Sequence, residues 1–190
     1  MKTKLAMLTL AVSCAFAGNA MALTKEEYKV QKDRVEADYK AGKGKCAALS
    51  ANAKDVCEAE AKGAEKVAKA ELEAQYKPSP QHDKKIRDAK ADATHDVAKE
   101  KCDDLAGNAK DVCVKDAKAA RTTAKADAKV SKASADANKD KAANVAGARK
   151  DANADKNEAM YKAARERCDT MAGAAKDGCQ NDAKVKFGMK

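Results

Sequence analysis

The chain has 190 residues, a mass of 20.1 kDa and a formal net charge of +9 at pH 7. Its apolar residues are mostly alanine, since aromatic residues make up only 3% of the chain and tryptophan is absent. Beyond residues 1–22, which have the pattern of a leader, the share of Leu, Ile, Val and Phe is about 10%, below the roughly 20% that an ordinary globular core requires. A β-sandwich, an α/β enzyme and a membrane-spanning bundle are therefore all poor fits to this composition.

Residues 1–22 resemble a cleavable secretory signal peptide. Lys2 and Lys4 give a positively charged start, and residues 5–16 are uncharged and mostly apolar. Residues 20–22 (Ala-Met-Ala) then place small side chains where signal peptidase requires them. The apolar run is too short to cross a membrane, so we expect export. A buried amino-terminal helix is the alternative.

The cysteines also point to an oxidising compartment. Cys14 lies inside the leader, and the six cysteines that remain are an even number, which suits three disulfides. Two alternatives concern the leader itself: cleavage after Ala17, and lipid attachment at Cys14, because residues 11–14 weakly resemble a lipobox. We expect a periplasmic location, with an outer-membrane lipoprotein as the minor alternative. A basic exported protein tends to approach anionic envelope polymers or lipid head groups.

A repeat with two cysteines eleven positions apart is the strongest signal in the chain. It occupies residues 45–57, 101–113 and 167–179, each time with Ala-Lys-Asp ahead of the second cysteine. An acidic residue, Ala and Lys follow each copy, beginning at Glu60, Asp116 and Asp182. Three copies of one pattern indicate three structural repeats.

Each repeat is predicted to be a helical hairpin. Small or apolar residues run into the motif in steps of four, three, four and three, which is one side of an α-helix. In the first repeat they are Val35, Tyr39, Gly42, Cys46 and Leu49. His95 takes the place of the tyrosine in the second repeat, which favours a packing role for it over a role as ligand or base.

The bend of each hairpin has its own signals. Gly107 and Gly173 suit the left-handed position that ends a helix, and Asn52 and Asn108 are predicted to cap the helix that follows. The third repeat has Ala174 at the cap position, so its second helix is expected to fray.

Antiparallel helices bring the two cysteines of one repeat together. Closing so short a loop stabilises the fold by roughly 3 kcal/mol in the chain-entropy model. Other connectivities are possible, but pairing within each repeat makes each unit self-sufficient. The predicted disulfides are Cys46–Cys57, Cys102–Cys113 and Cys168–Cys179.

Helix breaks separate the repeats. Residues 78–80 (Pro-Ser-Pro) end a helix firmly between the first and second repeats. No proline separates the second from the third, where residues 131–147 are the weakest helical stretch. A reversal there places all three disulfides at one end of an up-and-down bundle, and without a reversal residues 108–171 form one long helical rod. The predicted all-α organisation is a signal peptide and three disulfide-stapled hairpins, at residues 1–22, 23–78, 79–138 and 139–190.

The best candidate binding surface is a row of basic residues, referred to below as the basic stripe: Lys118, Arg121, Lys125, Lys129 and Lys132. Their spacing places them on one helix face, with Asp127 on the opposite side. The stripe is either an ordinary solvated face or a contact surface for lipopolysaccharide, peptidoglycan or anionic lipid. Export, interspersed acids and the lack of stacking aromatics disfavour nucleic acid as a partner.

No constellation for catalysis or for a cofactor is visible in the sequence. Zinc sites favour Cys pairs two to four residues apart, which do not occur, and only His82 and His95 are available as further ligands. His82 follows the proline break and is expected in solvent. The recurring Ala-Lys-Asp is either a binding motif or a consequence of the helix dipole, which favours an acid near a helix start. We expect no enzymatic activity and no bound cofactor.

The repeats resemble those of exported, Ala/Lys-rich proteobacterial proteins that are loosely labelled TolA-like or cell-envelope proteins. The similarity covers residues 28–184 and rests on the pattern Lys-Cys-x2-Leu-x-Gly-Asn-Ala-Lys-Asp-Val-Cys, from which the third repeat departs at Ala174 and Gly178. It implies an envelope location and a helical architecture, with no catalytic residue. Tol function is not implied, because the chain has a cleavable leader and no recognisable Tol terminal domain.

Together these features predict a non-enzymatic periplasmic protein with a structural, envelope-interaction or stress-protective role. One alternative is a carrier of a metal or small ligand that uses the cysteine ends and His95. A holdase-like chaperone, which binds unfolded clients on mobile helices, is another.

Overall fold

The computed structural model describes residues 22–136 and 141–189. These residues form helices in an up-and-down order: α1 (Lys25–Cys46), α2 (Ala51–Tyr76), α3 (Pro80–Cys102), α4 (Gly107–Ala135), α5 (Lys141–Cys168) and α6 (Gly173–Phe187). The predicted all-α fold is confirmed, and each predicted hairpin is a pair of consecutive helices. The expected leader, apart from its last residue, lies outside the described residues.

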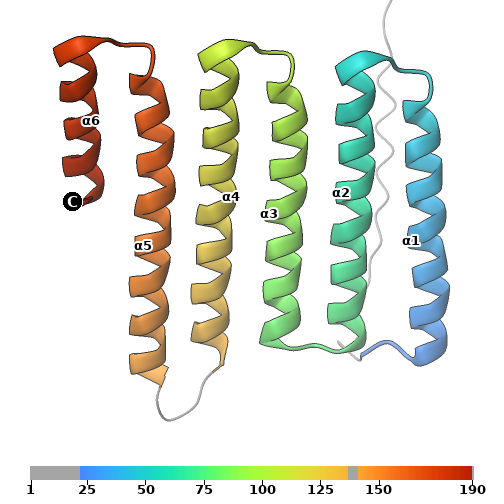
Figure 1. The fold of residues 1–190 in the computed structure, drawn as a ribbon. Helices are drawn as coiled ribbons and strands as arrows, with labels where there is room; N and C mark the ends of the chain where they lie inside the picture. Colours follow the sequence, from blue (N-terminus) through green and yellow to red (C-terminus); the bar gives the residue numbers. More distant parts are fainter. Residues whose placement is uncertain (1–21, 137–140, 190) are drawn as a thin grey trace, which may run out of the picture.

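The helices lie side by side in a single layer (Figure 1). Within the described residues, each helix contacts only the helix that precedes it and the helix that follows it in the chain. None of the described helices therefore covers either face of the layer. The fold is an open row of helices, in which nearest-neighbour contacts carry the packing, and not a bundle closed around a central core.

Small side chains fill the contacts inside the layer. The buried residues are mostly alanines, together with the first cysteine of each repeat and Leu72. At Gly63 on α2 the helices approach so closely that a Cβ atom would lie only 2.8 Å from the Cβ atom of Ala93 on α3. Contacts of this kind bury little apolar area per residue, so covalent links have to supply part of the stability.

The bends of the three hairpins are built alike. The amide of the residue three positions after the first cysteine donates to that cysteine's carbonyl oxygen at 3.0 Å in every repeat. Gly107 and Gly173 are left-handed as predicted, with φ of 54° and 55°, but each is the first residue of the second helix. The prediction that they end the first helix was wrong. Ala51 takes the same conformation in the first repeat, at φ 49°, where its Cβ atom makes it less favourable.

The two asparagines of the motif do not cap helices. The N-cap residues of α2 and α4 are Ser50 and Ala106, and neither makes a capping hydrogen bond through its side chain. The side-chain amide of Asn108 instead donates to the carbonyl oxygen of Glu166, at 2.9 Å, in the last turn of α5. This residue therefore links the second repeat to the third. The last repeat, which has no repeat after it among the described residues, has Ala174 at this position, and α6 is helical from Gly173 onward.

The last turn of α2 and the first turn of α3 lie at the end of the layer opposite the disulfides, and so do the last turn of α4 and the first turn of α5 (Figure 1). Pro80 begins α3, and the hydroxyl of Ser79 accepts a hydrogen bond from the amide of His82 at 3.2 Å. The chain also reverses between the end of α4 at Ala135 and the start of α5 at Lys141, so the long-rod alternative is excluded. The expected boundary between residues 138 and 139 lies outside the described residues.

Candidate functional site

Each repeat has one disulfide across its bend: Cys46–Cys57, Cys102–Cys113 and Cys168–Cys179. The Cα atoms of the paired cysteines are 5.6, 5.7 and 5.8 Å apart, and the first cysteine of each pair is at most 1% exposed. Because all six cysteines are bonded in this way, none of them offers a thiolate to a metal or a substrate.

The basic stripe lies on α4, and most of its charges are already paired. Arg121 and Lys125 both contact the carboxylate of Asp92 on α3, Lys125 at 2.7 Å. On the other side of α4, Lys129 lies 3.3 Å from Asp151 on α5. Lys132 pairs with Asp136 at the end of its own helix. Of the stripe, only Lys118 has no carboxylate within ion-pairing distance among the described residues.

Asp92 shows how these cations are used. Partial burial raises the pKa of the Asp92 carboxyl, but hydrogen bonds from Lys125 and Arg121 outweigh this effect, and the pKa lies below its ordinary value of 3.8. The carboxylate is thus ionised at neutral pH and is shared by two cations of the stripe. The stripe connects α4 to its neighbours and presents less free positive charge than its sequence suggests.

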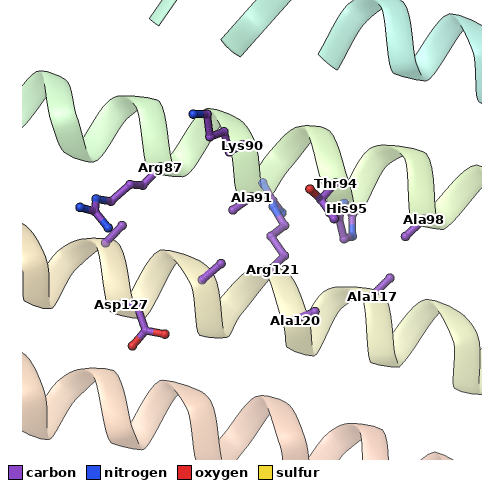
Figure 2. Close-up of a pocket in the computed structure, with 12 residues that line it drawn as sticks. Arg87, Lys90, Ala91, Thr94, His95, Ala98, Ala117, Ala120, Arg121 and Asp127 are labelled. Carbon is purple, nitrogen blue, oxygen red and sulfur yellow. The ribbon is translucent and has the colours of Figure 1, made fainter. Parts of the chain in front are cut away.

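A shallow apolar groove of about 390 Å³ lies beside the stripe, between α3 and α4. Its floor consists of alanines from both helices: Ala91, Ala98, Ala117, Ala120, Ala124 and Ala128. Figure 2 shows Arg87 and Arg121 reaching across the space between the two helices, whereas Lys90 points away toward α2 and Asp127 toward α5. The groove, referred to below as the α3–α4 groove, therefore combines an apolar floor with guanidinium groups at its rim.

A second groove, of about 600 Å³, lies between α4 and the last two helices. It shares Ala120 and Ala124 with the α3–α4 groove, so both open on the same face of α4. Met160 and Phe187 add larger apolar side chains to its lining. One face of the layer thus carries both grooves.

The two histidines serve packing and turn formation. His95 lines the α3–α4 groove, and its Nδ1 atom lies 3.2 Å from a carboxylate oxygen of the adjacent Asp96. The side chain of His82 is only 18% exposed, so the expectation that it lies in solvent was wrong. Its ring contacts the turn residues Lys77 and Ser79. In residues 22–136 and 141–189, no three His, Cys, Asp or Glu side chains gather as a metal site requires.

The lysine of Ala-Lys-Asp reaches across the bend of its own hairpin. Lys110 lies 3.0 Å from Asp103, and Lys176 lies 2.9 Å from Asp169. The hydrogen bond from Lys176 lowers the pKa of the Asp169 carboxyl. The motif therefore has a structural use in the second and third repeats. In the first repeat Ala47 stands where the acid would be.

Sequence reasoning missed the ion pairs that join successive repeats. The basic residue just before the first cysteine contacts the acid that follows the preceding motif: Lys101 lies 3.8 Å from Glu60, and Arg167 pairs with Asp116. A second pair recurs with its cation eleven residues earlier and its acid eleven residues later: Lys90 contacts Glu71 at 2.8 Å, and Lys156 contacts Asp127. Aligning the repeats reveals these positions, because the signs of the charges recur with the cysteines.

Searches of family models, curated proteins and solved structures find no match to this chain. In the part of the chain that the structure describes, no helix is both long enough and apolar enough to span a bilayer.

Proposed function

We propose that the protein is an exported, non-enzymatic component of the cell envelope. In this proposal the disulfide-clasped layer serves as a rigid platform, and one of its faces contacts an anionic lipid surface or envelope polymer. The observation that carries the proposal is the open layer itself, whose faces no other described helix covers. A platform of this kind binds through surface area and charge and needs no enclosed site.

The periplasmic location in this proposal has two supports. The first is the leader pattern of residues 1–22. The second is the set of three disulfides, which persist in oxidising compartments and are rare in the cytosol. The resemblance to exported Ala/Lys-rich proteins points in the same direction.

The face with the grooves is a better candidate contact surface than the basic stripe. Four of the five stripe cations have carboxylate partners. Arg87 at the rim of the α3–α4 groove is exposed and has no ion-pair partner among the described residues. A guanidinium beside an apolar floor suits an anionic amphiphile, which offers a phosphate for the charge and hydrocarbon for the floor.

Co-sedimentation with lipid vesicles tests the proposal and the choice of face. We expect the protein to bind vesicles that contain phosphatidylglycerol and not pure phosphatidylcholine, and we expect added salt to weaken the binding. The substitutions Arg87→Glu and Lys118→Glu make the same charge change at exposed, unpaired cations, one at the groove and one on the stripe. Weaker binding of R87E alone supports the groove face, and weaker binding of K118E alone moves the site to the stripe. Absence of binding at low ionic strength contradicts the lipid-contact proposal.

A holdase-like role is the second candidate, because the two alanine-lined grooves share one open face. Shallow, exposed apolar grooves suit an extended segment of an unfolded client protein better than a compact ligand. We expect a chaperone to suppress the aggregation of a reduced client protein in proportion to its concentration. Unchanged aggregation at a several-fold molar excess rejects this role.

A further inference from the structure

The two interfaces between repeats are built from the same positions. In each, the second helix of one repeat packs against the first helix of the next, and two basic residues of the incoming helix contact two acids of the preceding repeat. These pairs are Lys101–Glu60, Lys90–Glu71, Arg167–Asp116 and Lys156–Asp127. In these four recurring pairs the incoming helix supplies the cations, whereas Lys66–Asp96, Lys115–Glu166 and Lys129–Asp151 run the opposite way. The two sides of the interface therefore carry different residues at the recurring positions.

Small and apolar residues lie between these charges. Ala93 of α3 sits against Gly63 of α2, and in the next interface Ala159 and the buried Ala119 hold the corresponding positions. Val97, four residues after Ala93, lines the space between α2 and α3 together with Gly63. Ile86 lies seven residues before Ala93 and is half-buried. Cations at the edges and small side chains in the middle thus define a docking face for a helix.

The outer edge of α1 repeats this docking face with no described helix upon it. Arg34 and Lys45 correspond to the two cations, and Val30, Ala37 and Ala41 correspond to Ile86, Ala93 and Val97. All five α1 residues are exposed, Val30 to 69%. Neither cation has an ion-pair partner among the described residues.

The outer edge of α6 carries the complementary face. Asp182 corresponds to Glu60 and Asp116, which contact the incoming cation in the internal interfaces. Val185 corresponds to Gly63 and Ala119, and it is 83% exposed. The first repeat thus exposes an incoming face, and the last repeat exposes an outgoing one.

We propose that the α6 edge of one copy of the chain docks on the α1 edge of a second copy, in the register of the internal interfaces. Asp182 of one copy then pairs with Lys45 of the other. Because the two edges differ, the contact is head-to-tail. When it repeats the side-by-side packing of the layer, it extends that layer into open chains of molecules. With only 15 residues, α6 supplies one carboxylate and covers part of α1, so we expect association that is weak and dependent on concentration.

Sedimentation velocity on the processed protein from the periplasm tests this proposal, over a series of concentrations that reaches about 1 mM. We expect the weight-average sedimentation coefficient to rise with concentration and to fall with added salt. Lys45→Glu and Asp182→Lys each place like charges across the contact, which should weaken association by about tenfold. Both residues are exposed, so the folding of each variant should be unchanged, and circular dichroism checks this.

Mixing the two variants gives the decisive result. In an equimolar mixture, K45E chains and D182K chains offer opposite charges to each other at both edges, so the mixture should associate more strongly than either variant does alone. Lys43→Glu, two residues from Lys45 on the same helix and also exposed, is the control and should associate like the wild type. A wild-type protein that stays monomeric throughout, or one whose association D182K leaves unchanged, overturns the proposal. The second outcome points to a different or symmetric contact.

Discussion

The second and third repeats share one sequence pattern but have different surroundings. The second repeat lies between two others, and both of its helices contact a neighbouring repeat. Among the described residues the third has a neighbour on one side only, and its second helix has 15 residues where α4 has 29. Asn108 reaches across to Glu166, and the third repeat has Ala174 in its place. In this pair of repeats, a residue that contacts the neighbouring repeat is replaced where no described repeat follows. Asn52, the matching residue of the first repeat, has no hydrogen-bond partner for its side-chain amide among the described residues.

Removing a disulfide should have the largest effect on stability, and the consequences should differ between the second and third repeats. Replacing Cys102 and Cys113 by serine should lower the free energy of unfolding by about 3 kcal/mol and expose amides in the helices on both sides. The same change at Cys168 and Cys179 should release α6 and leave the first two repeats protected. Hydrogen exchange resolved along the chain measures both effects. Equal loss of protection everywhere in both variants contradicts nearest-neighbour packing.

Alanine substitutions at two glycines, one inside the layer and one on α6, distinguish the effect of close helix packing on stability from the effect of helix propensity. Gly63→Ala places a Cβ atom 2.8 Å from that of Ala93, and the overlap should cost about 1–3 kcal/mol, more than the gain in helix propensity. Gly178→Ala meets no atom within 4 Å and should stabilise the protein by roughly 0.5–1 kcal/mol. Thermal unfolding followed by circular dichroism compares the two. Stabilisation by G63A indicates that α2 and α3 pack less closely than described.

Because Asn108 links two repeats through one hydrogen bond, replacing it should have a smaller effect on the free energy of unfolding. Asn108→Ala removes a hydrogen bond to the carbonyl oxygen of Glu166 and should destabilise the protein by about 1 kcal/mol. Ala174→Asn restores the residue where no described helix offers a partner, so it should change the free energy of unfolding by no more than a few tenths of a kcal/mol. Urea unfolding measures both changes. A large gain from A174N favours the helix cap originally predicted from the sequence.

The smallest expected effect is a dependence of stability on pH through Asp92. Its pKa is lower in the folded chain than its ordinary value of 3.8, so its ion pairs with Arg121 and Lys125 stabilise the fold at neutral pH. That contribution should decline as the pH falls below about 4 and vanish once the folded carboxyl is protonated. Asp92→Asn should remove this part of the acid sensitivity and cost less than about 1 kcal/mol at pH 7. If wild type and D92N lose stability in parallel between pH 5 and pH 2, Asp92 has no such role.

The sequence predicts the fold well where the signal is local. Helical periodicity, the proline break at residues 78–80 and the pairing of cysteines within a repeat all depend on residues close in the chain, and the structure has each of them. The left-handed conformation of Gly107 and Gly173 also follows from residue type. Residue type does not predict which helix each glycine belongs to, because the end of the first helix and the start of the second both fall within the same few residues.

The features that the sequence did not reveal depend on neighbouring repeats. Asn108 resembles a helix cap within its own motif, and only the position of α5 shows that it donates to Glu166. The basic stripe looks like free charge on a single helix, because its partners Asp92 and Asp151 lie on two other helices. The choice between a closed bundle and an open layer also depends on these long-range contacts, since either arrangement satisfies the same helical periodicity.

Small-angle X-ray scattering of residues 22–190, with the disulfides oxidised, in dilute solution tests the open layer most directly. A single layer of helices is about 10–12 Å thick, the diameter of one helix with its side chains. We expect the thickness analysis of the scattering curve to give that value, with lateral dimensions several times larger. A compact particle at least two helix diameters thick in every direction would contradict the single-layer account.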